Sequence, residues 1–587
     1  MTKLRVGLLT SAFLIIGLSV PVSAEDAQSA QNPPITVEEE ARTQEGHVSG
    51  DFVYSIKEDG TARIFQCSKK EGEVIIPETI DGYTVTELGN SVFYQAAELT
   101  SVTLPNTLQT IGETVFMESG VTSINMPDSV TSIGKMAFYQ CENLRELQLS
   151  DGITEIPEHL CTNCKALEKL TLPSKLKSIG DYAFNMCEGL CELVLPDSLE
   201  TIGVGAFLMS DHLGEIQLPS QLQSIGQEAF FYCDKLSLKD PQFPGGLTYI
   251  GDNAFQGCMS LTEIRLPEHL EYLGKEAFYA CHNLAKVSLP DTLTAIPEGL
   301  FYFAKSLETI ELPANLTTIE PQAFQYCSKL TELVIPDKVV RIGEMAFANC
   351  TGLKNAFFPE SLTEIGEGCF EGNTACTAHV YLDSAAYQYV RANNIPYILR
   401  LPYTDVREGD WHYNYVASVY EMNIMTGLDP QTFGPSESLS RAQFAVILYR
   451  MEGEPDVSGL EPVEFPDVPA GCWYADAVTW ANKNGIITGY TEGPLAGKFG
   501  ASDSITRAQM ATMMYRYAQY LGYDTNVTGS LENFPDAADV AEFSKKGMEW
   551  VVEKEIITGD QGKLNPQGTA SRAVGATIIT RFLDLAN

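Results

Sequence analysis

The chain has 587 residues and is strongly acidic, with 38 lysines and arginines against 77 aspartates and glutamates and a formal net charge of −39. This balance argues against nucleic acid as a partner, because affinity for a phosphate backbone depends on clustered Lys and Arg. It suits an exported, soluble surface, and any anionic ligand would have to be held by a local pocket rather than attracted from a distance.

The first 24 residues have the pattern of a secretion signal. Lys3 and Arg5 precede an apolar run that ends at Val20, and the small residues that follow, up to Ala24, offer a cleavage site. The run is shorter than the roughly 20 residues that a membrane span needs, so we expect no membrane span in the mature chain. Residues 25–48 are predicted to form a disordered lead.

The segments on either side of the central repeats are predicted to cover the ends of the repeat stack. From Asp51 the residues alternate and then turn at Asp59-Gly60, which predicts a β-hairpin at the first edge. After Cys376, a segment with a short helix over residues 384–393 is predicted to cover the other edge.

A motif recurs about every 23 residues between these segments: an apolar strand ending in Leu-Pro, then Ile-Gly, then Ala-Phe, and often Cys. Residues one and three positions before the proline are apolar, and those two and four before it are mostly polar, which is the pattern of a short strand with one buried face. The motif aromatic falls at Phe93, Phe116, Phe138, Phe184, Phe207, Phe230, Phe255, Phe278, Phe301, Phe324, Phe347 and Phe370, with Cys161 in its place once. Such a fixed period predicts thirteen stacked coils, and residues 49–400 are assigned to one β-solenoid with capped ends.

This pattern resembles the BspA-like leucine-rich repeat family over about residues 50–400. The resemblance implies a leucine-rich-repeat β-solenoid on a cell-surface, adhesin-like protein. It leaves the ligand of the repeats open.

Large aromatic residues follow the motif aromatic by one or two positions in several coils. They include Tyr139, Phe231, Tyr232, Tyr279, Tyr302, Phe303 and Tyr326. Rings that project outward would form a ladder able to bind glycans or a protein partner. The alternative, which we favour, is that each ring packs against the next coil.

Many of the fourteen cysteines lie three residues after the motif aromatic. They are Cys141, Cys164, Cys187, Cys233, Cys258, Cys281, Cys327 and Cys350. Ser210, Ala304 and Asn373 take the same position in other coils, which indicates a tight slot. Stacked neighbours point their Cβ atoms in the same direction, so we predict buried thiols rather than a ladder of disulfides.

Beyond residue 401 a longer repeat replaces the 23-residue one, and three modules are assigned to residues 401–455, 463–522 and 532–587. The modules share a set of equivalent positions: the arginines Arg441, Arg507 and Arg572, each opening an apolar helical stretch; the preceding Ser440, Thr506 and Ser571, which are natural N-caps; the upstream aspartates Asp405, Asp467 and Asp536; and the glycines Gly427, Gly489 and Gly559. Each glycine is predicted to end a helix in the left-handed conformation.

These modules resemble three S-layer homology domains, a family in which three modules pack as an α-helical, pseudo-threefold unit and bind pyruvylated secondary cell-wall polysaccharide. The family's Thr-Arg-Ala-Glu signature keeps its arginine in every module here and loses its final acid. The family's tryptophan maps onto Trp411 and Trp473, with Phe543 nearby in the third module. The wall-polysaccharide-binding residues that the resemblance implies are Asp405, Trp411, Gly427, Arg441, Asp467, Trp473, Gly489, Arg507, Asp536, Gly559 and Arg572.

The chemistry of these residues suits such a ligand. A guanidinium can meet a ketal carboxylate in a two-point bond, and a tryptophan offers a flat apolar face to a sugar ring. Free amides at the helix N-termini would add to the attraction of an anion. The alternative is that each arginine merely starts a helix, and we prefer ligand binding because cations are disfavoured at helix N-termini.

Neither a catalytic centre nor a cofactor or metal site is predicted. The seven histidines occupy different phases of the repeat, and no metalloprotease, nucleophile-elbow or phosphate-loop motif is present. The leading hypothesis is therefore a non-enzymatic, secreted protein, held non-covalently in the cell wall or S-layer, whose repeat region recognises a protein or glycan. A purely structural envelope component is the first alternative, and an enzyme ranks third.

Overall fold

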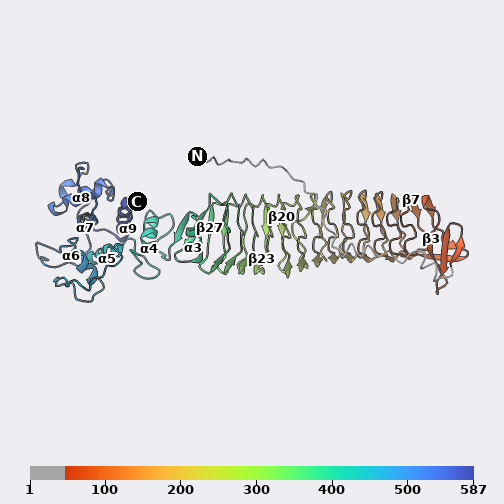
Figure 1. The fold of residues 1–587 in the computed structure, drawn as a ribbon, viewed down its shortest axis with the longest axis horizontal. Helices are drawn as coiled ribbons and strands as arrows, with labels where there is room; N and C mark the ends of the chain where they lie inside the picture. The colour runs from red at the N-terminus through yellow and green to blue at the C-terminus, as the bar shows by residue number, and fades with distance from the viewer. Residues whose placement is uncertain (1–45, 587) are drawn as a thin grey trace, which may run out of the picture. The chain divides into compact units, whose positions relative to one another are not determined.

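The computed structural model describes residues 46–586 and divides into two units (Figure 1). Unit 1 runs to Lys354 and includes Glu364–Ala375, and unit 2 comprises Asn355–Thr363 and the chain from Cys376 onward. The predicted secretion signal and most of the predicted lead lie outside the described residues. Strand β1 (His47–Ser49) begins inside the range assigned to the lead, so that range extends too far.

Unit 1 begins with the predicted hairpin. Strand β2 (Phe52–Ile56) pairs antiparallel with β3 (Ala62–Cys67), and the Gly60 N–H donates to the carbonyl of Lys57 at 2.9 Å to close the turn. Strand β3 then pairs in parallel with β6 (Tyr83–Leu88). The hairpin at Asp59-Gly60 is therefore confirmed, and it leads directly into the stacked coils.

Most coils contribute short strands to two parallel ladders, which confirms the β-solenoid (Figure 1). The first ladder contains, within unit 1, β4 (Glu71–Ile75), β7 (Glu98–Thr103), β9 (Ser123–Asn125), β11 (Glu146–Gln148), β13 (Lys169–Thr171), β16 (Glu215–Ile216), β18 (Ser237–Leu238), β20 (Glu263–Arg265), β22 (Lys286–Ser288) and β25 (Glu332–Val334). The second contains β8 (Thr110–Ile111), β10 (Ser132–Ile133), β12 (Glu155–Ile156), β14 (Ser178–Ile179), β15 (Thr201–Ile202), β17 (Ser224–Ile225), β19 (Tyr249–Ile250), β21 (Tyr272–Leu273), β23 (Ala295–Ile296), β24 (Thr318–Ile319), β26 (Arg341–Ile342) and β28 (Glu364–Ile365), while β5 (Thr79–Ile80) pairs antiparallel with β6. The winding has about 15 turns between residues 62 and 400, because strands beyond the first and last motif aromatics add turns to the thirteen predicted.

The motif phenylalanines stack along the core of the solenoid. Phe116 and Phe138 have ring centroids 5.1 Å apart and planes within 3° of parallel. Both are fully buried, and burying each such ring contributes about 2 kcal/mol. The glycine of the motif lets neighbouring coils approach, since a Cβ at Gly134 would lie 2.5 Å from the backbone nitrogen of Glu113. The 23-residue repeat thus encodes one set of contacts between neighbouring coils.

Two prolines interrupt the second ladder. In most coils the motif glycine donates its N–H to the preceding coil, as Gly180 does to the carbonyl of Ile156 at 2.8 Å. Pro157 and Pro297 stand at this position in two coils and have no N–H to donate. The ladder accordingly divides between β10 and β12 and again between β21 and β23.

The cysteine slot selects a hydrogen-bond donor as well as a small side chain. Cys233 Sγ donates to the carbonyl of Phe207 at 3.0 Å, Ser210 Oγ to that of Phe184 at 3.0 Å, and Asn373 Nδ2 to that of Phe347 at 2.8 Å. The eight slot cysteines are buried and free, as predicted. The other six cysteines, all in the described part of the chain, are also free, with Cys191 exposed and Cys472 partly buried. Burial raises the pKa of Cys187 to about 12.

Unit 2 begins with a small parallel sheet and a helix. Strand β27 (Asn355–Phe357) pairs with β29 (Thr377–Tyr381), which pairs with β30 (Tyr397–Arg400). Helix α3 (Ala385–Ala392) lies where the sequence predicts one, and Ser384 caps its N-terminus by accepting from the Tyr387 N–H.

Three pairs of helices follow, one pair in each module. They are α4 (Tyr413–Glu421) and α5 (Arg441–Met451), α6 (Ala475–Lys483) and α7 (Arg507–Tyr520), and α8 (Lys545–Glu553) and α9 (Arg572–Leu583); the 3₁₀ helices are η1 (Ala537–Asp539), η2 (Glu542–Ser544) and η3 (Asp584–Ala586). The first helix of each module packs against the second helix of another: α6 on α5, α8 on α7 and α4 on α9.

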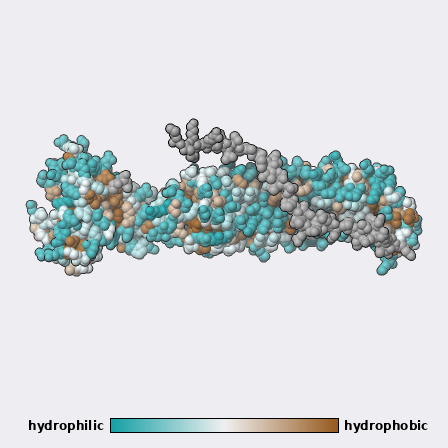
Figure 2. All heavy atoms as spheres, viewed as in Figure 1, coloured by the Kyte–Doolittle hydropathy of each residue, from teal (hydrophilic) through white to brown (hydrophobic). Residues whose placement is uncertain are grey.

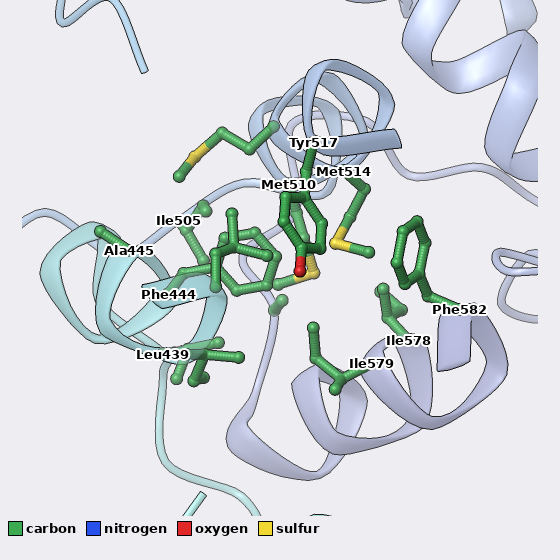
Figure 3. Packing of buried hydrophobic residues seen from close by; sticks show 14 of the residues in the cluster. Leu439, Phe444, Ala445, Ile505, Met510, Met514, Tyr517, Ile578, Ile579 and Phe582 are labelled. Atoms are coloured by element: carbon green, nitrogen blue, oxygen red, sulfur yellow. The ribbon is translucent and has the colours of Figure 1, made fainter. Parts of the chain in front are cut away.

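Backbone hydrogen bonds also join the three modules in a closed cycle, which we call the module ring. The Leu439 N–H donates to Ala570 at 2.9 Å, Ala570 to Ile505 at 3.0 Å, and Ile505 back to Leu439 at 2.8 Å. Figure 3 shows Leu439 and Ile505 beside Phe444, with Tyr517 nearby in a core built from side chains of all three modules. The predicted pseudo-threefold helical arrangement is confirmed.

Candidate functional site

The three signature arginines lie at the helix starts that the sequence predicts. Ser440 caps α5 by accepting from the Gln443 N–H, and the Gln443 side chain accepts from the Ser440 N–H in return. Thr506 caps α7 in the same way, and Ser571 caps α9. The glutamine that replaces the signature glutamate therefore keeps the reciprocal capping bonds in the first two modules.

Each signature arginine joins its own module to another one. Arg441 Nε donates to the carbonyl of Phe499 at 2.9 Å, Arg507 Nε to that of Leu564 at 2.8 Å, and Arg572 Nε to that of Phe433 at 2.7 Å. The three side chains are buried, and burial lowers the pKa of each guanidinium. They are structural links between modules as well as candidate ligand groups.

The three aspartates hold the loops that accept from the arginines. Asp405 accepts from the Phe433 and Gly434 N–H groups, both at 2.8 Å. Asp467 accepts from Phe499 and Gly500, and Asp536 accepts from Leu564 and Asn565. One loop residue is therefore held from both sides in each case. Its N–H donates to the aspartate of its own module, and its carbonyl accepts from an arginine of another module.

The carboxylate of Asp467 shows what these amide bonds do. Partial burial by itself would raise its pKa, but the hydrogen bonds from the backbone of Phe499, Gly500 and Ala501 outweigh that effect and hold the pKa below its usual value. The same balance, with two amides, lowers the pKa of Asp536. The predicted wall-binding aspartates are thus engaged with backbone amides within the protein.

The helix N-terminal amides are also occupied. The Arg441 N–H donates to the carbonyl of Asp503 at 2.9 Å, and the Ala442 N–H donates to that of Ala501 at 3.1 Å. The first amides of α7 and α9 bond to other modules in the same manner. The expectation that free amides would attract the ligand is wrong, because inter-module packing uses them.

Gly489 and Gly559 take the predicted left-handed conformation, with φ of 68° and 89°, but none of the three glycines ends a helix, so that part of the prediction is wrong. Helix α4 ends at Glu421, and Asn423 takes the left-handed conformation with φ 55°, four residues before Gly427. Gly427 is needed for another reason: a Cβ there would lie 2.5 Å from Cε1 of Tyr403. Gly489 and Gly559 lie against aromatic rings in the equivalent way.

A groove of about 430 Å³ brings together residues from all three modules, and we call it the Trp411 groove. Its floor is the loop Ile556–Asp560 with part of α9, and Arg507, Arg581 and Trp411 complete the lining. The Trp411 side chain is exposed, with 64% of its surface accessible. An exposed indole and two guanidinium groups thus face one hollow.

A second groove of about 250 Å³, the Trp473 groove, repeats this arrangement. The loop Ile424–Leu428 and part of α5 form its floor, and Arg450, Arg572 and Trp473 complete its lining. Trp473 is 66% exposed. In both grooves the loop, the signature arginine and the tryptophan come from three different modules.

The third equivalent position is covered. The guanidinium of Arg441 lies over the ring of Tyr490, with its central carbon 4.7 Å from the ring centroid, and Tyr490 donates to a carboxylate oxygen of Asp503 at 2.9 Å. Tyr490 directly follows Gly489, where the other modules have Leu428 and Asp560. The bulky ring therefore occupies space that the smaller residues leave open.

A second set of arginines was missed from the sequence. Arg450, Arg516 and Arg581 each lie nine residues after a signature arginine. Arg581 Nη1 is 3.3 Å from Thr558 Oγ1, and Arg516 Nη1 is 3.3 Å from Thr488 Oγ1. Their repetition at the spacing of the signature arginines was a usable signal.

The solenoid aromatics pack against one another and keep part of their surface exposed. Tyr279 and Tyr302 are stacked with centroids 4.8 Å apart, and Phe303 and Tyr326 with centroids 4.5 Å apart. Tyr232 is 36% exposed and makes an edge contact with Phe231. Tyr139 lies against His159 of the next coil. This is the packing given as the preferred alternative, and the ring edges remain available to a partner.

Membrane-spanning helices and metal clusters are both absent from the described chain. Over residues 46–586 the structure has no helix both long and apolar enough to cross a membrane. Over the same residues, no three His, Cys, Asp or Glu side chains gather as a potential metal site.

Two family models match the regions of the solenoid and of the three modules. The family model for the BspA type leucine rich repeat region matches residues 62–188, 109–237, 154–285 and 248–377, and the S-layer homology domain model matches 402–445, 464–511 and 533–573. A solved leucine-rich repeat protein from Bacteroides ovatus is 26% identical, with 60% of this chain and 99% of that chain covered and a TM-score of 0.48.

Two curated relatives match in part. An endoglucanase of Bacillus sp. (strain KSM-635) is 28% identical over 31% of this chain and 19% of its own length. The surface-layer 125 kDa protein of Lysinibacillus sphaericus is 29% identical over 29% of this chain and 14% of its own length. The chain thus spans less than a fifth of either relative, and the endoglucanase match lies in the S-layer homology region, so its name carries no catalytic residue over.

The S-layer homology domains and the S-layer relatives indicate a cell-surface or cell-wall location. The repeat model covers more than half of the sequence, in the region where the structure shows the solenoid. The chain therefore belongs to the BspA type leucine-rich repeat family and carries three S-layer homology domains after its repeats.

Proposed function

We propose that the three modules anchor the protein non-covalently to an anionic cell-wall polysaccharide, with pyruvylated secondary polymer as the ligand. The observation that carries this proposal is the repeated composition of the two open grooves: each combines two arginines with one exposed tryptophan. On a surface with a net charge of −39, these grooves concentrate positive charge locally.

The arginines have unequal roles in this proposal. Arg507 and Arg572 use Nε for a backbone carbonyl, which fixes the plane of each guanidinium beside a groove. Arg572 also donates through Nη2 to the carbonyl of Thr426 at 2.5 Å, so less of its guanidinium is free for a ligand than in Arg507. Arg450 and Arg581 make long bonds to the loops, and Arg450 also lies 3.5 Å from an exposed Glu454 carboxylate just beyond the end of its own helix. Both guanidinium groups can turn toward a ligand carboxylate, which for Arg450 would replace this exposed ion pair. A ketal carboxylate would meet both guanidinium groups, and the sugar ring would stack on the tryptophan.

The decisive experiment is co-sedimentation of the full chain with Gram-positive-type cell walls, before and after removal of the secondary polymer. Substituting Arg441, Arg507 or Arg572 would confuse binding with folding, because all three bridge modules. The informative variants are Arg450→Gln and Arg581→Gln. Loss of one charge-assisted bond, worth about 1.5–3 kcal/mol, should weaken binding by roughly 10- to 100-fold per groove.

The chain provides a matched control in Arg516→Gln. Arg516 occupies the equivalent position in the covered third site, so its loss should leave wall binding unchanged. Binding that survives polymer removal, or that falls as much for Arg516→Gln as for the other two variants, would contradict the proposal. Trp411→Ala and Trp473→Ala test the stacking part, since both side chains are exposed and their loss should leave the fold intact.

The repeats would then present a recognition surface for a protein or glycan, in an adhesin-like manner and without catalysis. The half-exposed rings of Tyr279, Tyr302, Phe303 and Tyr326 support this role. The alternative is a structural envelope component. Replacing Phe303 and Tyr326 by alanine and measuring adhesion of cells that carry the protein separates these two roles. An adhesin-like protein should lose adhesion, whereas a structural component should leave adhesion unchanged.

A further inference from the structure

One coil of the solenoid departs from its neighbours in several independent ways. This coil, residues 286–308, has Pro297 in place of the motif glycine and Ala304 in place of the slot donor. Pro297 cannot donate to the preceding coil, and Ala304 cannot donate to Phe278, whereas Cys281 does donate to Phe255 at 3.2 Å. The coil is therefore joined to its neighbours by fewer hydrogen bonds than the others.

The first ladder is open on the far side of the same coil. In paired coils the residue just after the strand donates onward, as Leu266 does to Ser288 at 3.0 Å and Leu149 to Thr171 at 3.1 Å. The equivalent Leu289 makes no such bond to Glu311. Among the described residues, 309–312 form no strand, and no backbone hydrogen bond connects them to β22 or to β25.

The open ladder exposes apolar side chains that other coils bury. Val287, Leu289 and Leu312 are half-buried. Leu147 and Leu333, at the position of Val287, have no exposed surface, and Leu149 and Ile335, at the position of Leu289 and Leu312, are each 3% exposed. The hollow between the two coils measures about 410 Å³. Its lining is Lys286, Val287, Ser288, Leu289, Asp291, Thr309, Glu311, Leu312, Pro313 and Ala314, and we call it the inter-coil cleft.

A comparison within the chain shows that an unpaired strand alone does not make a cleft. Residues 193–195 also lie outside any strand, next to the isolated bridge between Lys169 and Glu192. Leu170, Leu193 and Leu195 there remain only 8%, 5% and 7% exposed, and Leu172 alone is half-buried. The inter-coil cleft is therefore a distinct opening, in which unpaired backbone and exposed apolar side chains coincide.

We propose that the inter-coil cleft binds an extended peptide segment of a partner protein, which pairs its main chain with residues 309–312. Unpaired N–H and C=O groups along an extended wall are the recognition element of strand addition, and pockets for alternate side chains provide selectivity. Val287, Leu289 and Leu312 would receive apolar side chains of the peptide. Lys286 on one wall and Glu311 on the other would each favour an oppositely charged neighbour.

The cleft fits a peptide better than a glycan. No aromatic ring is part of its lining, so it offers no flat face on which a sugar could stack. The unpaired amides and carbonyls instead match the donor and acceptor pattern of a polypeptide backbone. The proposal does not depend on wall anchoring, since the cleft lies in unit 1 and shares no residue with the grooves of the three modules.

The test is selection of peptides from a phage-displayed library of random 12-residue sequences against the full chain, with Ala314→Trp in excess as competitor. Ala314 lies in the cleft lining, and an indole there should fill the hollow. An enriched peptide should lose at least 10-fold in affinity for Ala314→Trp and keep its affinity for Ser220→Trp. Ser220 follows a strand-closing proline as Ala314 does, in a coil outside the cleft, which makes it a matched control.

Two further measurements address the main-chain pairing. A peptide N-methylated at alternate positions cannot donate from them and should bind at least 10-fold more weakly than its parent. In hydrogen–deuterium exchange, the bound peptide should protect the amides of residues 309–312 and leave those of 193–195 unchanged.

Four outcomes would overturn the proposal. These are failure to enrich any sequence, equal binding to Ala314→Trp, no effect of N-methylation, and absence of new protection at 309–312. A parallel glycan array tests the other class of ligand. A glycan whose binding Ala314→Trp abolishes would show that the cleft serves carbohydrate instead of peptide.

Discussion

The double contact at Phe499 makes a sharp energetic prediction about the module ring. Its N–H donates to Asp467 and its carbonyl accepts from Arg441, so two side chains from different modules restrain one residue. Removing either should release the loop and weaken the contact of the other. We therefore expect Asp467→Ala and Arg441→Ala to be strongly non-additive.

The magnitudes follow from the hydrogen bonds that each variant removes. Asp467→Ala removes a charged acceptor from two short amide bonds of 2.8 and 2.6 Å, which should cost about 3 kcal/mol because the carboxylate is only half-buried. Arg441→Ala leaves a buried carbonyl without its donor and removes packed side-chain atoms, for about 2–3 kcal/mol. The double variant should lose about 1 kcal/mol less than the sum.

The chain suits this measurement because all four tryptophans lie in unit 2, at positions 411, 473, 480 and 550. Trp480 and Trp550 are 3% and 0% exposed, so their fluorescence in urea reports unfolding of the module core while the solenoid stays silent. The matched control is Asp467→Ala with Arg572→Ala, which act on different loops and should add to within about 0.5 kcal/mol. The shared-residue argument would be refuted if the losses in unfolding free energy added for Asp467→Ala with Arg441→Ala. It would also be refuted if both pairs of variants showed the same coupling energy.

Further expectations concern thiols, pH and truncation. Iodoacetamide at neutral pH should label exposed Cys191 first and partly buried Cys472 more slowly. Unfolding without reductant should expose all fourteen thiols to labelling, as counted by intact mass. A lower count would indicate disulfides. The folded pKa values of Asp467 and Asp536 lie below the unfolded value of about 3.9, so their stabilisation is present above that pH and is lost as pH falls through the lowered pKa. The urea midpoint should therefore fall from pH 5 to pH 3, and less steeply in Asp467→Asn. Deleting residues 532–587 removes α8 and α9, which cover α7 and α4, and should abolish the cooperative fluorescence transition rather than leave two working modules.

The solenoid could be predicted because one coil's contacts repeat. Each motif position contacts the same position one coil away. The regular spacing of residues such as Phe116 and Phe138 therefore predicts the ring stack that the structure shows. Local signals at the ends of strands and helices also predicted the structure correctly, such as Asp59-Gly60 for the hairpin and Ser440 for the start of α5. The two Ile-Pro positions also stood in the sequence, and their effect on the ladder follows from the missing N–H.

The composition of the grooves could not be predicted in the same way. A helical pattern tells which face of α4 is apolar but not which helix covers it, and α4 covers α9, far along the chain, rather than the α5 of its own module. The sequence therefore could not show which module contributes each residue of a groove. The glycine error has a local origin, since Gly427 follows a helix and a turn, and the sequence does not show that Asn423 already ends that helix.

The residues outside the shared signature decide what each groove can hold. On the face of the modules that Figure 2 shows, hydrophilic residues predominate and hydrophobic residues gather in smaller areas. All three modules share the arginine at the helix start, the loop glycine and the aspartate that anchors the loop, so their backbones follow one plan. The residue after the glycine differs: Leu428 and Asp560 leave an open groove, whereas the ring of Tyr490 lies over Arg441. Because the signature arginines mainly hold modules together, their presence predicts the fold, and ligand capacity depends on Arg450, Arg581 and these variable positions. A match to the signature therefore does not by itself tell whether a groove is open.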